Sequence, residues 1–411
     1  MSRRTWLVVG AVLAVLTVAV VVVALASTSS STSSSNASSG ASSSAGSSSA
    51  GGAAVLPAAS ATVPTGSQVV VAMGHLDDPA NTFYELFDRS AGSPSWVLAT
   101  PPGVADNGGL VVGAATTGSL TAGFLPSADL TFSVLAQRAA GTSAWTPGNL
   151  PGTLARRPDG LATGADGEVA AVLARPTPSV VDAGPGLTSW ERRTTVAGLA
   201  AVSPRCPVDG ITAVALTSSG STVVGTACAR SSAAGLFTAA PSGGWTLLGP
   251  LVLPGAPTAT QVLRLQAGAG GLVALLEGSG GGGATLAVAW GGSGADLSAS
   301  APLTVPVGWS VRGTAIGGGS GQKVTVLLGS DSGSGLRLES VDGPASGTAP
   351  SPWVALPAPP DGTAAVAAVG TDTDAFVPSG SQLTVWSTSP GAPSWTRVSR
   401  QSVPIQYGSS D

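Results

Sequence analysis

One short signal recurs about every 50 residues along this chain: an aspartate or asparagine followed by glycine, directly before a small apolar run. The clear copies are Asn107-Gly108, Asp159-Gly160, Asp209-Gly210 and Asp361-Gly362, and weaker positions near Gln261 and Val311 keep the same period. A fixed period of this length is typical of repeat architectures, so the chain is expected to build one supersecondary unit many times.

Tryptophans mark the same period. They occur in similar contexts at Trp96, Trp145, Trp190, Trp245, Trp353 and Trp395. The unit near Ser298–Leu303 lacks its tryptophan. Once-per-unit spacing favours a structural residue on an outer strand, packed between neighbouring units, over a residue that stacks on carbohydrate. Trp290, Trp309 and Trp386 fall outside the period, and Trp309 is the first candidate among them for a ligand contact.

Each unit contains up to four runs of strand length bounded by turn-forming residues. In the clearest unit these runs are Ile211–Leu216, Thr222–Ala229, Gly235–Ala239 and Trp245–Leu248. Four antiparallel strands in about 50 residues form one blade of a β-propeller, so the sequence predicts an all-β fold of this kind. The count predicts seven blades. Six or eight blades remain alternatives, because the unit Gln261–Ser310 is rich in glycine and its first and last residues are not clearly marked in the sequence.

The propeller domain is predicted over residues 63–411, with the ring closed by its two ends. The first unit supplies three strands between Gln68 and Ala99 and lacks an inner strand, whereas the chain end offers the strand Val403–Tyr407. Placed beside Val69–Met73, this segment would close the ring and leave no open sheet edge.

The N-terminal segment predicts a membrane anchor. Trp6–Ala26 contains 21 residues and no charge, which spans about 30 Å as a helix. Arg3 and Arg4 favour a cytoplasmic location for residues 1–5 and an extracytoplasmic one for all that follows. The alternative is a signal peptide cleaved after Ala26, giving a secreted protein. Residues 27–62, rich in Ser, Thr, Gly and Ala, are expected to form a flexible linker.

The charge balance argues against one class of function. Charged residues make up 9% of the 411 residues and the net charge is −4, which is not the composition of a basic nucleic-acid binder. The expected partners are the membrane, through the N-terminal helix, and an envelope protein or polysaccharide. We expect a monomeric propeller without a cofactor. Lys323 is the only lysine, a usage that resembles the coding of a GC-rich, actinobacterium-like genome.

Cys206 and Cys228 are the only cysteines, and both belong to one unit. In an extracytoplasmic compartment the expected state is a disulfide. Closing a loop of about 22 residues would contribute roughly 3 kcal/mol at most. A hairpin turn at Ser219-Gly220 would place Cys228 opposite Ile211.

The sequence supplies no complete catalytic or metal-binding constellation. His75 is the only histidine, and no GxSxG motif accompanies it for nucleophilic catalysis. Asp77, Asp78, Asp372 and Asp374 lie in predicted loops that could meet across the ring closure, where a carboxylate pair could hydrolyse a glycosidic bond. Asp372 and Asp374 also resemble fragments of a calcium-binding loop, without the glycine and the distant glutamate of an EF-hand. The commoner role of such aspartates is to form turns. No catalytic residue and no metal ligand is therefore predicted, and these four aspartates stay candidate ligand contacts.

Two short segments resemble the Asp-box (BNR) repeats of secreted sialidase-like propellers. Pro241–Thr246 (PSGGWT) keeps the glycines and tryptophan of that repeat, and Gly329–Leu336 (GSDSGSGL) keeps its aspartate and glycine. The resemblance implies a propeller fold. Such sialidases also use an arginine triad and a tyrosine nucleophile, but Tyr84 and Tyr407, the only tyrosines, lie in no matching motif.

Together these features predict a membrane-anchored, extracytoplasmic β-propeller that acts as a binding or scaffolding module at the cell envelope. A rigid ring presents variable loops in which a ligand or protein can be bound. The alternative is a degenerate secreted glycoside hydrolase or lyase that uses loop carboxylates. A third possibility is a purely structural envelope protein.

Overall fold

The computed structural model describes residues 59–63, 66–74, 82–101, 110–115, 120–124, 135–148, 158–173, 177–203, 206–228, 232–253, 257–268, 271–280, 283–291, 297–317, 322–333, 335–344 and 350–404. All of them belong to one compact unit, Ala50–Asp411. The predicted anchor Trp6–Ala26 lies outside the described residues. Within the described ranges, no helix is both long and apolar enough to cross a membrane.

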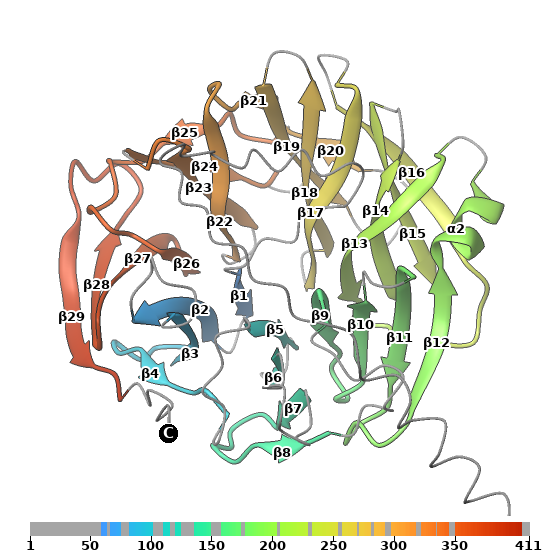
Figure 1. Cartoon of the computed structure of the whole chain (residues 1–411), viewed down its shortest axis with the longest axis horizontal. Coiled ribbons are helices and arrows are strands. Elements are labelled where there is room, and N and C mark those ends of the chain that lie inside the picture. The colour runs from blue at the N-terminus through green and yellow to red at the C-terminus, as the bar shows by residue number, and fades with distance from the viewer. Residues whose placement is uncertain are drawn as a thin grey trace, which may run out of the picture. The chain divides into compact units, whose positions relative to one another are not determined.

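The described strands form seven successive groups, each an antiparallel meander (Figure 1). Groups 1 to 4 are β1 (Ala59–Val63), β2 (Gly66–Gly74), β3 (Thr82–Ser90) and β4 (Val97–Leu98); β5 (Leu110–Ala114), β6 (Leu120–Phe124), β7 (Leu135–Arg138) and β8 (Thr146–Pro147); β9 (Gly160–Thr163), β10 (Val169–Leu173), β11 (Ser179–Ala183) and β12 (Trp190–Thr195); and β13 (Val208–Leu216), β14 (Thr222–Cys228), β15 (Ala233–Ala239) and β16 (Thr246–Val252).

Groups 5 to 7 are β17 (Ala259–Gly268), β18 (Gly271–Gly280), β19 (Gly283–Gly291), β20 (Ser298–Ala299) and β21 (Leu303–Thr304); β22 (Trp309–Gly317), β23 (Lys323–Ser330), β24 (Leu336–Asp342) and β25 (Val354–Ala355); and β26 (Ala365–Val369), β27 (Asp372–Ser379), β28 (Gln382–Thr388) and β29 (Thr396–Ser402). In group 5 both β20 and β21 pair with β19. The prediction of an all-β fold is confirmed.

A hydrophobic cluster joins each group to the next, and a further cluster joins the last group to the first. Leu135 of group 2 packs with Leu161 of group 3, and Phe376 of group 7 packs with Phe87 of group 1. The described strands therefore form a closed ring in which each group buries both of its faces. This explains why middle strands such as β10 (VAAVL) are apolar at every position, since neither face meets water.

The first strand of each group lines the inside of the ring, and group 1 takes its inner strand from the N-terminal side. β1 pairs antiparallel with β2, with Ser60 opposite Val69, and parallel with β22 of group 6, with Ser60 opposite Ala315. β1 therefore occupies an edge of β2 that the sequence had assigned to Val403–Tyr407. Residues 405–407 lie outside the described residues.

Val403 nevertheless contributes to ring closure. Its backbone N–H donates to Ser381 O at 2.7 Å, and its buried side chain belongs to the cluster that includes Val69 and Met73 of group 1. Val403, directly after β29, thus packs into the seam between groups 7 and 1.

The disulfide predicted between Cys206 and Cys228 is present, with a Cα–Cα distance of 5.3 Å. It follows the short helix α2 (Val196–Val202), whose first turn is capped by Thr195 through Gly198 N–H. Cys228 lies opposite Val208 and not opposite Ile211. The hairpin pairs Leu216 with Thr222, one residue away from the register of a tight turn at Ser219-Gly220, and irregularities after Val208 and Ile211 shift the register of β13 further. The position predicted for Cys228 was therefore wrong, although the pairing was right.

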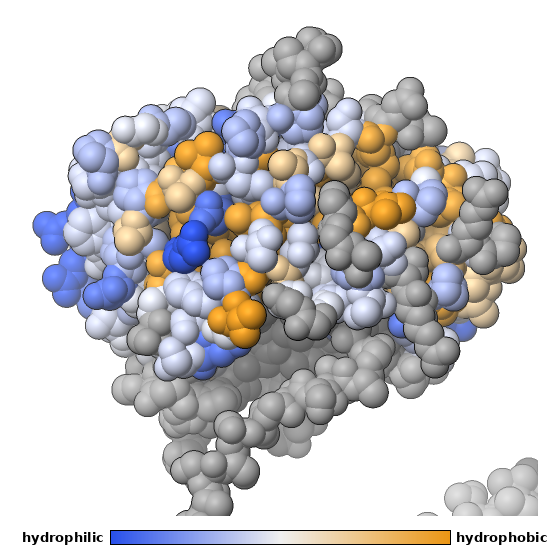
Figure 2. All heavy atoms as spheres, turned by 90° about the horizontal axis from the view of Figure 1, so that it is seen from above, coloured by the Kyte–Doolittle hydropathy of each residue, from blue (hydrophilic) through white to orange (hydrophobic). Residues whose placement is uncertain are grey.

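The surface carries few charges, as the composition requires. Figure 2 shows apolar residues interspersed among weakly polar ones over one face, with most of the strongly hydrophilic residues toward the side where β29 lies in Figure 1. Several exposed valines are single residues on the outermost strands, such as Val252, Val354 and Val398. Isolated apolar residues of this kind are ordinary on protein surfaces.

Candidate functional site

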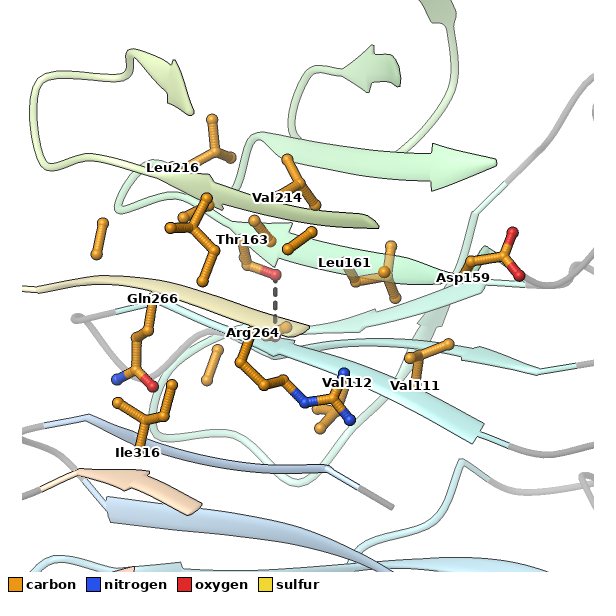
Figure 3. Close-up of a pocket in the computed structure, with 18 of the residues that line it drawn as sticks. Val111, Val112, Asp159, Leu161, Thr163, Val214, Leu216, Arg264, Gln266 and Ile316 are labelled. Carbon is orange, nitrogen blue, oxygen red and sulfur yellow. Dashed lines mark hydrogen bonds between the residues drawn. The ribbon is translucent and has the colours of Figure 1, made fainter. Parts of the chain in front are cut away.

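A cavity of about 100 Å³ lies inside the ring. Its walls come from the inner strands of groups 2 to 6, namely β5, β9, β13, β17 and β22 (Figure 3). The volume is enough for several water molecules and is below the several hundred Å³ typical of sites for drug-sized ligands. The cavity can therefore accept only a small molecule or one end of a larger one.

Most of the cavity lining is aliphatic. The labelled residues in Figure 3 include Val112, Leu161, Val214, Leu216 and Ile316, whose side chains come from four different inner strands. These residues follow from the repeat itself, because inner strands that face a narrow interior carry small and branched apolar side chains.

Arg264 is the one basic residue in this lining. It lies in the middle of β17, and its side chain reaches toward β22, where Nε donates to Thr314 Oγ1 at 3.2 Å. A second contact runs from Nη1 to Leu263 O at 3.3 Å. Burial lowers the pKa of Arg264 to about 10, so the guanidinium stays charged at neutral pH.

The hydroxyls in the lining serve the ring itself. Thr163 Oγ1 donates to Gly113 O at 2.9 Å, which ties β9 to β5. Thr212 Oγ1 donates to Gly225 O at 3.2 Å within group 4. Asp159 is the one carboxylate in the lining, and Figure 3 shows it at the far end of the labelled residues, directed away from Arg264.

Asp374, one of the predicted ligand contacts, has a structural position at the seam between groups 7 and 1. Its side chain is fully buried, and Oδ2 accepts from Arg89 Nη1 at 2.9 Å and from Trp96 Nε1 at 2.8 Å. Trp96 also meets Phe376 edge to face, with ring centroids 4.9 Å apart. The carboxylate therefore links β27 to β3 and to the residue before β4.

Two other predicted contacts, Asp372 and Trp309, lie within the described residues. Asp372 begins β27 and is half-buried. Burial lowers the pKa of Lys323, and the nearby carboxylates of Asp342 and Asp372 oppose that effect. Trp309 begins β22, is half-buried and packs against the cluster between groups 5 and 6. Asp372, Asp374 and Trp309 are not part of the cavity lining. His75, Asp77 and Asp78 lie outside the described residues.

The periodic tryptophans tie neighbouring groups together, as predicted. The indole N–H of four of them donates to a carbonyl of the preceding group or of its outer connection: Trp145 to Ala99 O, Trp245 to Arg193 O, Trp353 to Ala301 O and Trp395 to Pro357 O, at 2.9 to 3.3 Å. Trp190 instead packs against the cluster between groups 2 and 3, and its indole Nε1 has no hydrogen-bond partner among the described residues. Trp96, in the first group, donates to the Asp374 carboxylate of the last group instead. Sequence spacing thus identified a structural residue correctly.

Sequence reasoning missed Arg264. The available signal was an arginine within the apolar run Val262–Leu265, because a charged residue amid inner-strand residues is unusual and needs a partner or a function. Arg264 lies in the unit Gln261–Ser310, whose ends were the least clearly marked in the sequence, so the inner strand of this unit was not assigned.

Comparisons with known proteins support the fold but assign no family and no function. No family model and no curated protein matches the sequence, so the resemblance to Asp-box repeats receives no support. A putative 6-phosphogluconolactonase from Bacteroides uniformis is similar with a TM-score of 0.50 and 12% identity, covering 84% of this chain and 98% of that chain.

Two further solved structures show weaker similarity. A puromycin-hydrolyzing peptidase from Mycobacterium tuberculosis gives a TM-score of 0.48 at 14% identity, covering 84% of this chain and 53% of that chain, so this chain spans about half of the peptidase. The lectin of Aleuria aurantia, a six-bladed β-propeller that recognises fucose, gives 0.41 at 13% identity, covering 85% and 96%. The similarity is distant, and with the closed ring of strand groups it defines a β-propeller-like protein.

Proposed function

We propose that this chain is an extracytoplasmic ligand-binding β-propeller held at the membrane by Trp6–Ala26, and that it binds its ligand in the central cavity. The observation that carries the proposal is the cavity itself, which joins the inner strands of five successive groups and has a mostly aliphatic lining with a few polar side chains, among them Arg264, Gln266 and Asp159. Concave, mostly apolar sites with few polar groups are the usual binding sites of proteins.

The extracytoplasmic location rests on two features. The apolar segment Trp6–Ala26 follows two arginines and precedes a linker of small polar residues, an arrangement typical of an anchored domain outside the cell. The Cys206–Cys228 disulfide is typical of an oxidising compartment.

We further infer that the seven strand groups are seven blades. The seven clusters that join successive groups, the last one joining group 7 to group 1, support this count. Each blade then presents its inner strand to the cavity or to its neighbours, and β1 completes the first blade.

The glycoside hydrolase or lyase alternative gains less support from the geometry. A two-carboxylate mechanism needs two acids facing one substrate, whereas the cavity lining holds a single carboxylate, Asp159. Asp374 is enclosed by Arg89 and Trp96 at a seam between groups, where it stabilises the ring.

Thermal unfolding of the full chain in nonionic detergent tests the proposal. Small neutral sugars, carboxylates, amines and phosphates are added separately, and one class is expected to raise the midpoint. The variant Ala114→Phe, which places a larger side chain at the cavity wall, should abolish that rise, whereas Ala299→Phe on the exposed strand β20 should keep it. A ligand effect that survives in Ala114→Phe, or no effect from any class, would overturn cavity binding.

A further inference from the structure

The outermost strand of group 7 has an open edge that is longer than most others in the ring. β29 ends the sheet order β26-β27-β28-β29, and no other described strand pairs with its outer edge. It has 7 residues and no proline, whereas β4, β8, β20, β21 and β25 have 2 residues each and β16 carries Pro250. An uncovered edge of this length offers a row of backbone N–H and C=O groups with which another extended chain can pair.

The backbone groups that face outward from β29 follow from its pairing with β28. Val403 N–H donates to Ser381 O at 2.7 Å, directly after the last pair of the ladder, so these two residues form a hydrogen-bonded pair. Hydrogen-bonded and non-hydrogen-bonded pairs alternate along an antiparallel ladder, and by this alternation Arg400 and Ser402 belong to the second kind. The N–H and C=O groups of Arg400 and Ser402 therefore point away from β28, toward the open edge.

A β-bulge places the two arginines of β29 on one face of the sheet. Arg400 lies opposite Thr384 and Arg397 lies opposite Trp386, so Val398 is the extra residue. In a regular strand, residues three apart point to opposite faces, and one inserted residue brings them to the same face. Because Thr384 and Trp386 are alternate residues of β28, the two arginines are spaced like alternate residues of a regular strand.

Both arginines are accessible to a partner. Arg397 and Arg400 are exposed, and neither forms an ion pair with a described residue. β29 contains no acidic residue, unlike β12, where Glu191 precedes Arg192. Ion pairs do hold other arginines of the described ranges, namely Arg89, Arg138, Arg193, Arg312 and Arg337.

The charge on this edge selects between partners. Most of the strongly hydrophilic residues in Figure 2 lie toward the side where β29 lies in Figure 1. Pairing with β29 of a second copy would bring the arginines of both copies together, and like charges on neighbouring strands are destabilising. A strand that carries carboxylates at alternate positions would instead place one beside each arginine. The edge therefore disfavours self-association and favours an acidic partner.

We propose that the outer edge of β29 binds an extended acidic segment of a partner protein, which adds an antiparallel strand to group 7. Backbone hydrogen bonds to Arg400 and Ser402 supply affinity, and carboxylates beside Arg397 and Arg400 supply specificity. The proposal is independent of binding in the central cavity, because β29 is an outermost strand and none of its residues belongs to the cavity lining.

Fluorescence anisotropy of the full chain in nonionic detergent, with a short labelled peptide of alternating threonine and glutamate, tests the role of charge. The peptide is expected to bind, and its counterpart with glutamine in place of glutamate should bind about tenfold more weakly, because hydrogen bonds to a charged group are lost. Equal affinity for the two peptides would overturn the role of charge. Tighter binding of polygalacturonate, an acidic polysaccharide, would overturn the assignment of a peptide partner.

Two N-methylated peptides test whether a strand is added. In an antiparallel arrangement, the residue opposite Arg400 directs its N–H toward β29 and its side chain to the face of Arg400, so this residue is a glutamate. Methylation of the glutamate nitrogens should therefore weaken binding about tenfold, whereas methylation of the threonine nitrogens should leave it unchanged. Equal affinity for the two methylated peptides would show a contact through charge alone and would overturn strand addition.

Variants of the protein locate the contact. The double variant Arg397→Gln with Arg400→Gln should weaken binding of the acidic peptide about tenfold. Arg192→Gln, which removes an exposed arginine from the outermost strand β12, is the matched control and should leave binding unchanged. An unaltered affinity in the double variant, or an equal loss in Arg192→Gln, would overturn the assignment to β29.

Discussion

Two arginine–aspartate pairs at seams of the ring differ in what they join: Arg89 with Asp374, and Arg193 with Asp182. A third pair, Arg138 with Asp88 at 2.6 Å, joins the consecutive groups 1 and 2. At the seam of groups 7 and 1, Arg89 and Asp374 are 285 residues apart and their closest atoms are 2.9 Å apart. At the seam of groups 3 and 4, Arg193 Nε lies 3.0 Å from Asp182 Oδ2 on the neighbouring strand of the same group. The first pair holds together parts of the chain that no short connection joins, whereas the second adds to a seam already joined by the chain.

The surroundings of the two pairs differ in the same sense. Asp374 also binds the Trp96 indole, and Ser67 Oγ donates to Ala368 O at 2.7 Å across the same seam. The seam of groups 3 and 4 is bridged by α2, whose Leu199 is buried in the shared cluster together with the disulfide. At the seam of groups 7 and 1, which no short connection joins, polar side-chain contacts between distant residues add to the shared hydrophobic cluster.

Removing Asp374 should have the largest effect on stability. Asp374→Ala leaves the partly buried Arg89 and the buried Trp96 N–H without their acceptor, so the free energy of unfolding should fall by about 4 kcal/mol. Urea unfolding measures this. The control Asp331→Ala removes an exposed ion pair to Arg312 and should change stability by less than about 1 kcal/mol. Equal effects in the two variants would contradict the structural role of Asp374.

Removing the disulfide should have the next largest effect, at the other seam. Replacing both Cys206 and Cys228 by serine should lower the free energy of unfolding by roughly 3 kcal/mol at most, because the unfolded chain regains the entropy of a loop of about 22 residues. A reducing agent should destabilise the native protein to a similar extent. The reducing agent should leave the free energy of unfolding of the variant unchanged, since the chain has 2 cysteines and both are replaced. A native protein whose stability does not respond to reduction would argue against a stabilising role of the disulfide.

Asp182 should give a smaller effect that depends on pH. Burial raises the pKa of Asp182 to about 6, and nearby Arg193 opposes part of that rise. Because the carboxyl titrates near 4 when unfolded, the folded protein binds more protons between pH 4 and 6. The stabilisation that Asp182 contributes is therefore fully present below pH 4, and it falls by about 2 kcal/mol as the pH rises through 6.

The comparison of Asp182→Asn with the native protein isolates this contribution. The stability difference between the two should change by about 2 kcal/mol between pH 4 and pH 7, in favour of the variant at the higher pH. Ser298→Asn, on the exposed strand β20 of group 5, serves as the control and should show no such change. A pH-independent difference between Asp182→Asn and the native protein would show that the buried carboxyl does not titrate in this window.

The periodic features of the fold could be predicted from residues alone. The Asp-Gly steps and tryptophans marked the units, and strands such as β13 and β14 were placed closely because their apolar runs end at turn residues such as Gly220, whose φ of 75° suits glycine. The inner strand β1 was assigned to the linker, since backbone pairing with β22 is a contact between segments about 250 residues apart. No local pattern reports such a contact.

The sequence by itself determined the repeat unit, its strands and the pairing of its two cysteines, because these depend on residues close together in the chain. Only the tertiary structure decided that Asp374 serves the seam of groups 7 and 1 and that Arg264 faces the cavity. The physical reason is that a charged side chain acquires its role from what surrounds it: Arg89 supplies Asp374 with a counter-charge, and the inner strands of the neighbouring groups form the apolar wall around Arg264.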